Sequence, residues 1–502
     1  MRTNKLIKNT ISSLILQIVT IFTGFVIPKL ILESYGSEVN GLLNSITQFL
    51  SIIAFLELGV GAVVQSALYK PLAENNISKL NEIYASAQKF FSRLAKALCC
   101  YVIVLIFIYP LFSSNHFNIT YVVSLIIIMS INSVAQYYFG IVNSLFLTAD
   151  QKGYIQYNVQ ILTVVINTIF CIILIKAKFS IHIVKLTTAL IYLIRPIYLN
   201  YYIKRKYNIN KKIKLDYEPI EQKWNGVAQH IAAIILDGTD TIVLTIFADL
   251  KLVSVYSVYY LVVSGIKAMF NAMTTGVQAL LGNIYARGCK EELIDTFKMT
   301  EWIIHLVTIF IMGIAACLIT PFVLVYTNGV NDANYNQKLF GYLISFAYAA
   351  YCLRLPYHIM IRACGRYRET QKNYIFSAVI NILISIIFVW RYGLVGVAIG
   401  TLCAMLFQAI GLARYNAKNI VGLSYIDMLK PFIIDILTMG IGILVSNKVV
   451  NLTIINCNFL FWLGLAVKTT IIWIVVVSCI NILFYRNNMI QILKRINKWE
   501  KK

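Results

Sequence analysis

Charged residues are scarce in this sequence. Asp, Glu, Lys and Arg make up 13% of the 502 residues, whereas hydrophobic residues make up 59%. A soluble globular chain carries roughly 25% charged residues, so this composition excludes a soluble protein and indicates a membrane protein with many spans. Acidic residues are the rarer charge, 21 against 44 Lys and Arg. The basic excess lies in short segments between apolar runs, which favours a role in membrane topology over nucleic-acid binding.

Enzyme signatures are missing as well. The sequence contains no P-loop, H-E-x-x-H or G-x-S-x-G motif, so we predict no catalytic residue. Its ten cysteines have no metal-ligand spacing. We interpret them as small core residues and predict neither a metal site nor a cofactor. We also expect no cleavable signal peptide, because the first apolar run (14–32) is too long and lacks a small-residue cleavage site.

Fourteen apolar runs are long enough to cross a bilayer, which takes about 20 helical residues. We therefore predict an all-α membrane protein with spans at 10–32, 41–68, 94–112, 119–147, 155–175, 181–203, 224–247, 252–282, 300–326, 337–361, 373–390, 393–415, 430–450 and 458–485. With the N-terminus in the cytoplasm, about 32 Lys and Arg lie on the cytoplasmic side and about 8 outside, which fits the positive-inside rule. Both termini are then cytoplasmic. Lys176, Lys178 and Lys185 run against this bias, since they fall in an outer loop.

The two halves of the chain resemble each other at a shift of about 212–214 residues. YNVQILTVVINTIF (157–170) aligns with QKNYIFSAVINILI (371–384). Because six spans separate equivalent points, both copies enter the membrane in the same direction. Two such lobes around a central cavity are typical of a transporter. The predicted domains are a six-helix N-terminal lobe (1–203), a basic cytoplasmic linker (204–223), a six-helix C-terminal lobe (224–415), and two extra helices with a basic cytoplasmic tail (416–502).

Basic residues deep inside apolar runs are the first candidate site residues, because such charges normally face a protein interior or a watery cavity. In the tenth predicted span, four basic residues follow at four-residue steps on one helical face: Arg354, His358, Arg362 and Arg366. Pro356 removes a backbone donor beside Arg354 and is expected to kink or open the helix there. Guanidinium groups bind phosphate bidentately, so we expect Arg354 to face a substrate cavity. Interfacial anchoring is the favoured alternative for Arg362 and Arg366.

Two neighbouring spans carry polar stripes. The stripe in 252–282 repeats at three- and four-residue spacing and comprises Ser257, Tyr260, Ser264, Lys267, Asn271, Thr274 and Gln278. The preceding span aligns Asn225, Gln229, Asp237 and Thr241. We interpret both stripes as cavity walls and assign Lys267, Asn271 and Gln229 to substrate binding. Arg195, followed by Pro196 in the sixth span, is a shallower candidate that could instead reach the interface.

Three acidic residues are candidates for coupling transport to Na⁺ or H⁺. Asp237 and Asp240 lie one turn apart, so their like charges disfavour double ionisation. One of them is then protonated or paired with Lys267, and a purely structural ion pair is the alternative. Glu57, within IIAFLELGVGAVVQ, shares a helical face with Gly61 and is the third candidate.

Two helix contacts are expected near the C-terminus. Gly396 and Gly400 form a small-xxx-small pattern, typical of close packing between membrane helices. Asp435 and Lys468, in the two extra spans, are expected to pair with each other. The 32 tyrosines could stack on sugar rings, but we assign most of them to the membrane interface.

Two stretches resemble a known family: ILESYGSEVNGLLNSITQFLSIIAFLELGVGAVVQSALY (31–69) and DGTDTIVLTIFADLKLVSVYSVYYLV (237–262). They are similar to the Y-G…G-L and L-x-L-G-x-G elements and the seventh-span Asp plus V-x-x-Y-S pattern of O-antigen and capsule repeat-unit flippases. These form the polysaccharide transporter branch of the multidrug/oligosaccharidyl-lipid/polysaccharide (MOP) exporter superfamily, and the resemblance covers nearly the whole chain. It implies a flippase of the bacterial inner membrane that moves undecaprenyl-pyrophosphate-linked oligosaccharides to the outer leaflet by alternating access. The implied partners are this glycolipid, the bilayer, and polysaccharide polymerase or chain-length proteins.

Three alternatives stay open. A lipid II flippase has the same number of spans, but its first two spans typically carry several arginines, where this chain offers only Lys29 and Glu57. A multidrug exporter of the same superfamily would favour a net acidic cavity for cations. A membrane polymerase or ligase would show a large external loop with catalytic side chains. None is visible in the sequence, so we predict a transporter and not an enzyme.

Overall fold

The computed structural model describes residues 2–57, 60–113, 117–207, 209, 227–422, 424–450 and 458–490. Within these ranges all regular elements are helices: α1 (Arg2–Ser51), η1 (Ile52–Glu57), α2 (Val60–Glu74), α3 (Ile77–Ile108), α4 (Pro110–Ser113), α5 (Ile119–Ala135), η2 (Gln136–Gly140), α6 (Ile141–Ala149), α7 (Gly153–Lys176), α8 (Ile181–Lys206), α9 (Val227–Phe247), α10 (Leu250–Ala286), α11 (Lys290–Tyr326), α12 (Lys338–Leu353), α13 (Leu355–Ala363), α14 (Tyr367–Tyr392), α15 (Leu394–Asn416), η3 (Ala417–Val421), α16 (Tyr425–Val449) and α17 (Phe459–Phe484). Most of the predicted linker (204–223), together with Asn225, lies outside the described residues.

The number of spans agrees with the sequence prediction. In the described part of the chain, 12 helical segments are long and apolar enough to cross a membrane. One of them, Ile7–Ser51, contains the first predicted span and half of the second, joined at Gly36 with φ 83° and ψ 175°. A positive φ is readily adopted by glycine, so the chain turns there between two helices. With α2 and α9 completing the second and seventh spans, the predicted all-α fold of about 14 spans is confirmed.

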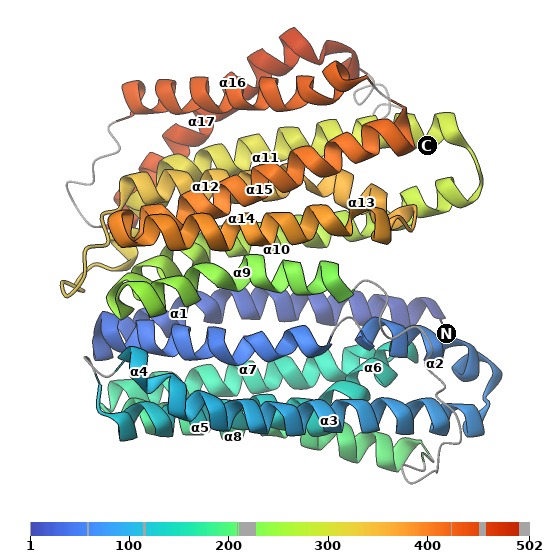
Figure 1. Ribbon diagram of the computed structural model, residues 1–502, viewed down its shortest axis with the longest axis vertical. Helices are drawn as coiled ribbons and strands as arrows, with labels where there is room; N and C mark the ends of the chain where they lie inside the picture. The colour runs from blue at the N-terminus through green and yellow to red at the C-terminus, as the bar shows by residue number, and fades with distance from the viewer. Residues whose placement is uncertain are drawn as a thin grey trace. The chain divides into compact units, whose positions relative to one another are not determined.

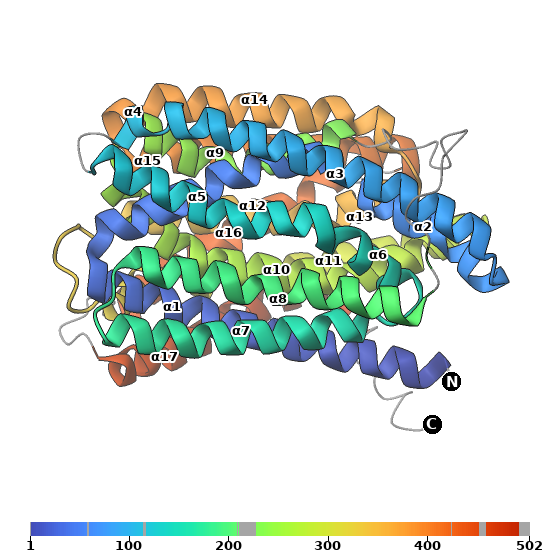
Figure 2. The ribbon, with the colours of Figure 1, turned by 90° about the horizontal axis from the view of Figure 1, so that it is seen from below.

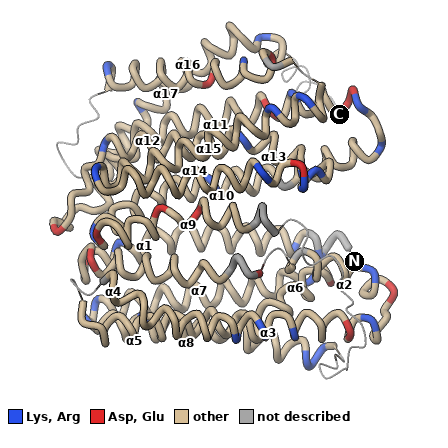
Figure 3. Tube along the Cα trace, viewed as in Figure 1, with Lys and Arg blue, Asp and Glu red and all other residues tan. Residues whose placement is uncertain are grey.

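The helix surfaces suit a bilayer. Large apolar side chains stand exposed along the spans, for example Phe107 at 74%, Trp390 at 71% and Ile436 at 70% exposure. A water-soluble protein rarely exposes contiguous apolar patches of this kind, whereas lipid-facing helices require them. Figure 3 shows that most charged positions of each part of the chain lie near helix ends. We conclude that the helix middles face lipid or other helices.

The chain divides into two compact units, unit 1 (Met1–Ser254) and unit 2 (Val255–Lys502). Within each unit most helices lie side by side with roughly aligned axes (Figures 1 and 2). In unit 1, α1 packs on α7 and α5 packs on α8, whereas in unit 2 α15 packs on α12 and α14, and α11 packs on α12, α16 and α17. The predicted domain boundaries at 203, 223 and 415 stay predictions.

Glycine brings α14 and α15 into close contact. A Cβ atom on Gly396 would lie 2.5 Å from the backbone of Phe388, and one on Gly400 would lie 2.2 Å from the Ser385 hydroxyl. Only a residue without a side chain fits at these two positions. The predicted small-xxx-small contact is confirmed, and the Asn381 amide strengthens it by donating to the Thr401 hydroxyl at 3.0 Å.

Three predicted spans are interrupted. The second changes from α1 into the 3-10 helix η1 and resumes as α2, and the fourth contains the π-helical turn η2 between α5 and α6. The tenth breaks at Arg354, between α12 and α13, which confirms the kink expected from Pro356. Under the repeat, η2 and the break at Arg354 fall at equivalent positions. Irregular backbone at membrane depth is tolerated where it is buried in protein or lines a watery cavity, so these breaks point to the functional regions.

Candidate functional site

Arg354 lies at the break between α12 and α13 and is nearly buried, with 7% of its surface exposed. Its Nη1 donates a hydrogen bond to the amide oxygen of Gln408 on α15. Gln408 donates in turn to the Ser377 hydroxyl on α14 at 3.0 Å. Neutral side chains of two helices, α14 and α15, therefore fix the position of this guanidinium group without neutralising its charge.

The ring of Tyr351 contacts two cations. Its centre lies 4.3 Å from the guanidinium carbon of Arg354 and 4.7 Å from the ammonium nitrogen of Lys267. Lys267 also lies 5.8 Å from the ring centre of Tyr348, and the Tyr351 hydroxyl donates to Asn271 Oδ1 at 3.1 Å. Ring faces attract cations electrostatically. Because both cations meet one ring, their charges lie within about 9 Å of each other. We call these five residues the Tyr351 cluster.

Arg354 retains hydrogen-bonding capacity. Its Nε is buried and meets no partner. Within the described ranges the guanidinium group forms no ion pair with a carboxylate, since its polar contacts are with Gln408 and the Tyr351 ring. A buried charge without a counter-ion is costly, and guanidinium binds phosphate through paired hydrogen bonds. The arrangement therefore suits an anionic ligand.

Further tyrosines extend the cluster along α10. Tyr260 meets Tyr348 edge to face at 5.7 Å between ring centres, and Tyr256 stacks on Tyr260 at 5.7 Å. Tyr348 and Tyr351 were not among the residues predicted from the sequence, because most tyrosines were assigned to the membrane interface. One signal was available, because Tyr351 lies three residues before Arg354 and hence on the same helical face.

The other basic residues of the tenth span have different surroundings. His358 is half-buried, and its Nδ1 contacts the Tyr374 hydroxyl on α14. Arg362 and Arg366 are exposed, and Arg366 pairs with Glu369 at 3.1 Å. Their exposure fits the interfacial alternative.

Unit 1 contains a second guanidinium group inside the helix bundle, and this one is partly buried. Arg195 on α8 is half-buried, and its Nη2 donates weakly to Gln156 Oε1 at 3.4 Å. Its Nε is buried without a partner, as is that of Arg354. The Gln156 amide donates to the Thr148 hydroxyl at 2.8 Å. A side-chain amide therefore holds Arg195, as one holds Arg354, and these surroundings differ from those of an arginine at the membrane interface.

A cavity of about 420 Å³ lies among α1, α5, η2 and α8 of unit 1. Its polar lining includes Thr47, Ser51, Asn132, Ser133, Tyr137 and Lys185. Lys185, which the topology prediction grouped with the outer loop, lies within α8, and α8 begins at Ile181 as the predicted span 181–203 does. Glu57 lies close to Tyr137, and its Oε1 is 3.4 Å from the Cβ position of Gly61, which confirms their shared face.

The acidic residues of α9 differ in burial. Asp240 is 3% exposed, whereas Asp237 is exposed, and both have interaction partners. The suggested pairing of one of them with Lys267 stays a prediction. The side chain of Gln229, another predicted site residue, lies outside the described part of the structure. Within the described ranges, no group of three potential metal ligands occurs.

The expected pair between Asp435 and Lys468 is wrong. Asp435 Oδ2 lies 2.6 Å from Nδ1 of His305 on α11, and both side chains are buried. Lys468 is exposed on α17. Its flexible stem lets the ammonium group reach a polar environment, whereas the short Asp435 side chain requires a partner inside the bundle.

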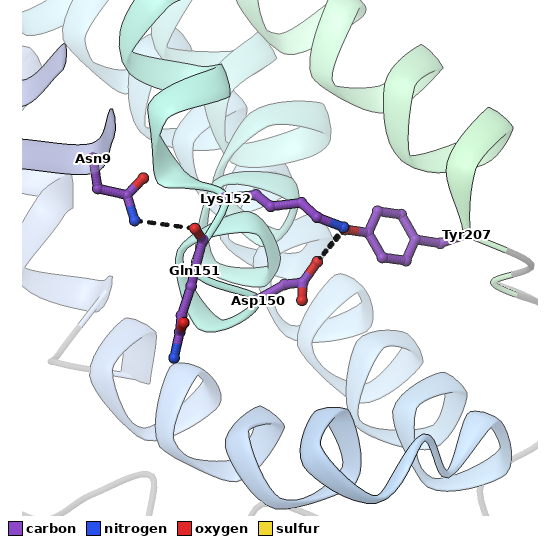
Figure 4. A network of polar contacts seen from close by, with 5 residues as sticks. All are labelled: Asn9, Asp150, Gln151, Lys152 and Tyr207. Carbon is purple, nitrogen blue, oxygen red and sulfur yellow. Dashed lines mark hydrogen bonds and ion pairs between the residues drawn. The ribbon is translucent and has the colours of Figure 1, made fainter. Parts of the chain in front are cut away.

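A polar network holds the connection between α6 and α7 in unit 1 (Figure 4). Lys152 Nζ lies 2.7 Å from Asp150 Oδ2 and donates to the Tyr207 hydroxyl at 2.7 Å. The Asn9 amide of α1 donates to the Gln151 carbonyl at 3.0 Å. Partial burial alone would lower the pKa of Lys152, but its hydrogen bonds to Asp150 and Tyr207 outweigh burial and raise the pKa. The network ties α1, the α6–α7 connection and the end of α8 together.

No protein-family model and no curated protein sequence matches the chain. Solved structures do match. The lipid II flippase MurJ, in an inward closed conformation, aligns over 96% of this chain and 100% of its own length, with a TM-score of 0.69 and 17% identity. A multidrug resistance MATE family transporter of the MOP superfamily aligns in its inward-facing conformation over 80% of this chain and 95% of its own, with a TM-score of 0.67 and 14% identity. An outward-facing MATE structure gives a TM-score of 0.58 at 13% identity, over 84% of this chain and 96% of its own.

The chain has the same fold as these MurJ and MATE structures. The resemblance seen in the sequence is therefore supported at the level of the fold. MurJ and the MATE transporters represent two of the alternatives that the sequence left open, so the choice among branches depends on the chemistry of the site.

Proposed function

We propose that this protein is a flippase that moves undecaprenyl-pyrophosphate-linked oligosaccharide repeat units from the cytoplasmic to the outer leaflet of a bacterial inner membrane, for O-antigen or capsule synthesis. The observation that carries the proposal is the Tyr351 cluster. It presents two cations on one aromatic ring, and one of them, Arg354, is buried without a carboxylate partner among the described residues. His358 and Arg195 are further candidates for contacts with the same substrate, whereas the exposed Arg362 is assigned to the membrane interface.

The pyrophosphate is the substrate group that most needs help to cross the membrane. Transfer of an ionised group into an apolar medium costs far more than a protein can offset unless the charge is paired. Arg354 and Lys267 supply two positive charges within about 9 Å, which suits two adjacent phosphates. Of the tyrosines beside them, Tyr260 is only partly buried and is the candidate for stacking on a sugar ring. Rocking of one part of the transporter against another would then expose the site to each leaflet in turn.

Lipid II is the second candidate substrate. It is favoured by the similarity to the MurJ flippase, which extends over 96% of this chain. Export of cationic drugs is disfavoured, because Arg354 and Lys267 would repel a cation. The proposed energy source is a gradient of Na⁺ or H⁺, and Glu57, Asp237 and Asp240 are the candidate coupling residues. The proposal also places both termini in the cytoplasm. Polymerase or chain-length proteins are the candidate partners.

Reconstitution tests the proposal. The purified protein is placed in proteoliposomes with a fluorescent undecaprenyl-pyrophosphate oligosaccharide, with lipid II, or with a cationic dye, and arrival in the opposite leaflet or the lumen is measured with and without ion gradients. Protein-dependent movement of the oligosaccharide, faster than that of lipid II, supports the proposal. Movement of lipid II alone selects the second candidate, and uptake of the dye alone contradicts both.

A further inference from the structure

A cavity of about 380 Å³ lies in unit 2 among α11, α16 and α17. Its polar lining includes Lys298, Glu301, Trp302, His305, Lys430 and Asp435. These residues are separate from the Tyr351 cluster. Helices α16 and α17 correspond to the two spans that lie outside the predicted sequence repeat.

His305 and Asp435 form a buried pair beside the cavity. The imidazole Nδ1 lies 2.6 Å from the carboxylate Oδ2, with side-chain exposures of 4% and 11%. The rings of Tyr357 and Phe432 enclose the imidazole at 6.1 and 5.4 Å between ring centres. Because the carboxylate fixes a proton on Nδ1, the second ring nitrogen is left to gain or lose one.

The second nitrogen, Nε2, is buried and meets no partner in good hydrogen-bond geometry among the described residues. The backbone of Leu353 lies within interaction distance of the imidazole ring. Leu353 is the last residue of α12 and directly precedes Arg354. A proton on Nε2 would therefore create a donor beside the helix break that positions the Tyr351 cluster.

Helices α12, α13, α16 and α17 pack against α11 around this imidazole. α12 contributes the Leu353 backbone, α13 contributes Tyr357, and the end of α17 contributes Tyr485. The charged groups of α11 and α16 that line the cavity are Lys298, Glu301, Asp427, Lys430 and Asp435. Glu301 lies one turn before His305 and on its helical face, so two carboxylates surround the imidazole and stabilise a positive charge on it.

We propose that Glu301, His305 and Asp435 form a proton-binding site whose occupancy controls the helix break at Arg354. A proton from water in the cavity adds to the Nε2 lone pair, and the new N–H donates to the Leu353 carbonyl. Asp435 and Glu301 balance the charge, and loss of the proton to the cavity releases the bond. Proton binding stands independently of the transported substrate. Its coupling to movement of the substrate rests on the proposed function.

Solid-state NMR of ¹⁵N-histidine-labelled protein in lipid bilayers tests the site, because ring nitrogen shifts report both tautomer and charge. The chain has five histidines, and His305→Gln assigns the signal. We expect His305 to change between the neutral and the doubly protonated form between about pH 5 and 8. Asp435→Asn should move the midpoint by at least about one pH unit, whereas His182→Gln should leave it unchanged. A constant charge state of His305 throughout this range in the wild type would overturn the proposal.

Proteoliposomes then test the coupling. A pH gradient of either direction should change the transport rate of the wild type at least threefold relative to equal pH on both sides. His305→Gln should still move substrate down a substrate gradient, but its rate should not respond to pH. An equal pH response in the variant would overturn the coupling. A pH-dependent His305 signal in a protein that moves no glycolipid would refute the proposed function while supporting the proton site. Both variants should elute as single monodisperse peaks in size-exclusion chromatography, which shows that they are folded. If His305→Gln misfolds, Asp435→Asn takes its place in the comparison.

Discussion

The ammonium nitrogen of Lys267 lies 4.7 Å from the centre of the Tyr351 ring, and the Arg354 guanidinium carbon lies 4.3 Å from the same centre. One aromatic ring thus brings together two cations that are 87 residues apart in the sequence. Like charges repel, so this arrangement is stabilised by the ring and by any anion that binds it. The first predictions concern this relationship.

Removal of the guanidinium group should stop transport. We expect Arg354→Ala to lower the rate of glycolipid movement at least tenfold while the protein still inserts and folds, because the substrate anion loses its principal donor. Arg354→Lys should restore part of the rate, since it returns the charge without the planar pair of donors. Initial rates in proteoliposomes measure both effects. Arg362→Ala, at an exposed position, is the control; full activity of Arg354→Ala would remove this residue from the mechanism.

The ring and the hydroxyl of Tyr351 can be tested separately. Tyr351→Phe keeps the ring between the cations and loses only the hydrogen bond to Asn271, so we expect a change below about threefold. Tyr351→Leu removes both cation–π contacts, which are worth roughly 1–2 kcal/mol each when desolvated. Its transport rate should fall about tenfold or more. Equal rates for the Phe and Leu variants would show that the ring does not organise the cations.

Helix packing at Gly400 should control stability. Gly400→Ala places a Cβ within 2.2 Å of the Ser385 hydroxyl and 2.9 Å of its backbone nitrogen, so α14 and α15 must separate. We expect a loss of roughly 1–3 kcal/mol in stability and a lower melting temperature in detergent. Gly440→Ala on α16 is the matched control, because its Cβ would meet nothing within 4 Å. An unchanged melting temperature for Gly400→Ala would contradict the close helix contact.

The network around Lys152 predicts a pH dependence. Partial burial lowers the pKa of this lysine, but hydrogen bonds to Asp150 and Tyr207 raise it above the ordinary value of 10.5. A raised pKa means that the folded chain holds the proton more tightly than the unfolded chain. The stabilisation is therefore complete below about pH 10.5 and is lost as pH rises through the folded-state value.

Melting curves of Lys152→Met test this dependence. The variant should melt roughly 2 °C lower than the wild type at neutral pH, which corresponds to about 1 kcal/mol. The difference should stay constant through neutral pH and shrink above about pH 10.5. Lys70→Met, at an exposed lysine, is the control. A difference that grows with pH would contradict the sign of the linkage.

Local patterns predicted most of the fold and part of the site. Span positions follow from apolar runs, and the break at Arg354 follows from Pro356, because both signals are encoded within a few residues. The contact between Gly396 and Gly400 and the neighbouring helix was likewise visible as a four-residue spacing. Such features depend on the backbone and its immediate neighbours, so one sequence is enough to find them.

Partners from distant segments could not be predicted in the same way. Asp435 pairs with His305, 130 residues away, and not with Lys468 on the adjacent helix. Helix periodicity states which residues share a face, but it does not state which helix covers that face.

Binding of undecaprenyl pyrophosphate to the purified protein tests the central claim most directly. Affinity is measured in nanodiscs for the wild type, Arg354→Gln and Arg362→Gln, with undecaprenol, which lacks the phosphates, as the reference ligand. We expect Arg354→Gln to weaken binding of the pyrophosphate at least tenfold and Arg362→Gln to change it less than threefold. Undecaprenol should bind all three proteins equally. Equal affinity of the wild type and Arg354→Gln for the pyrophosphate would contradict the central claim.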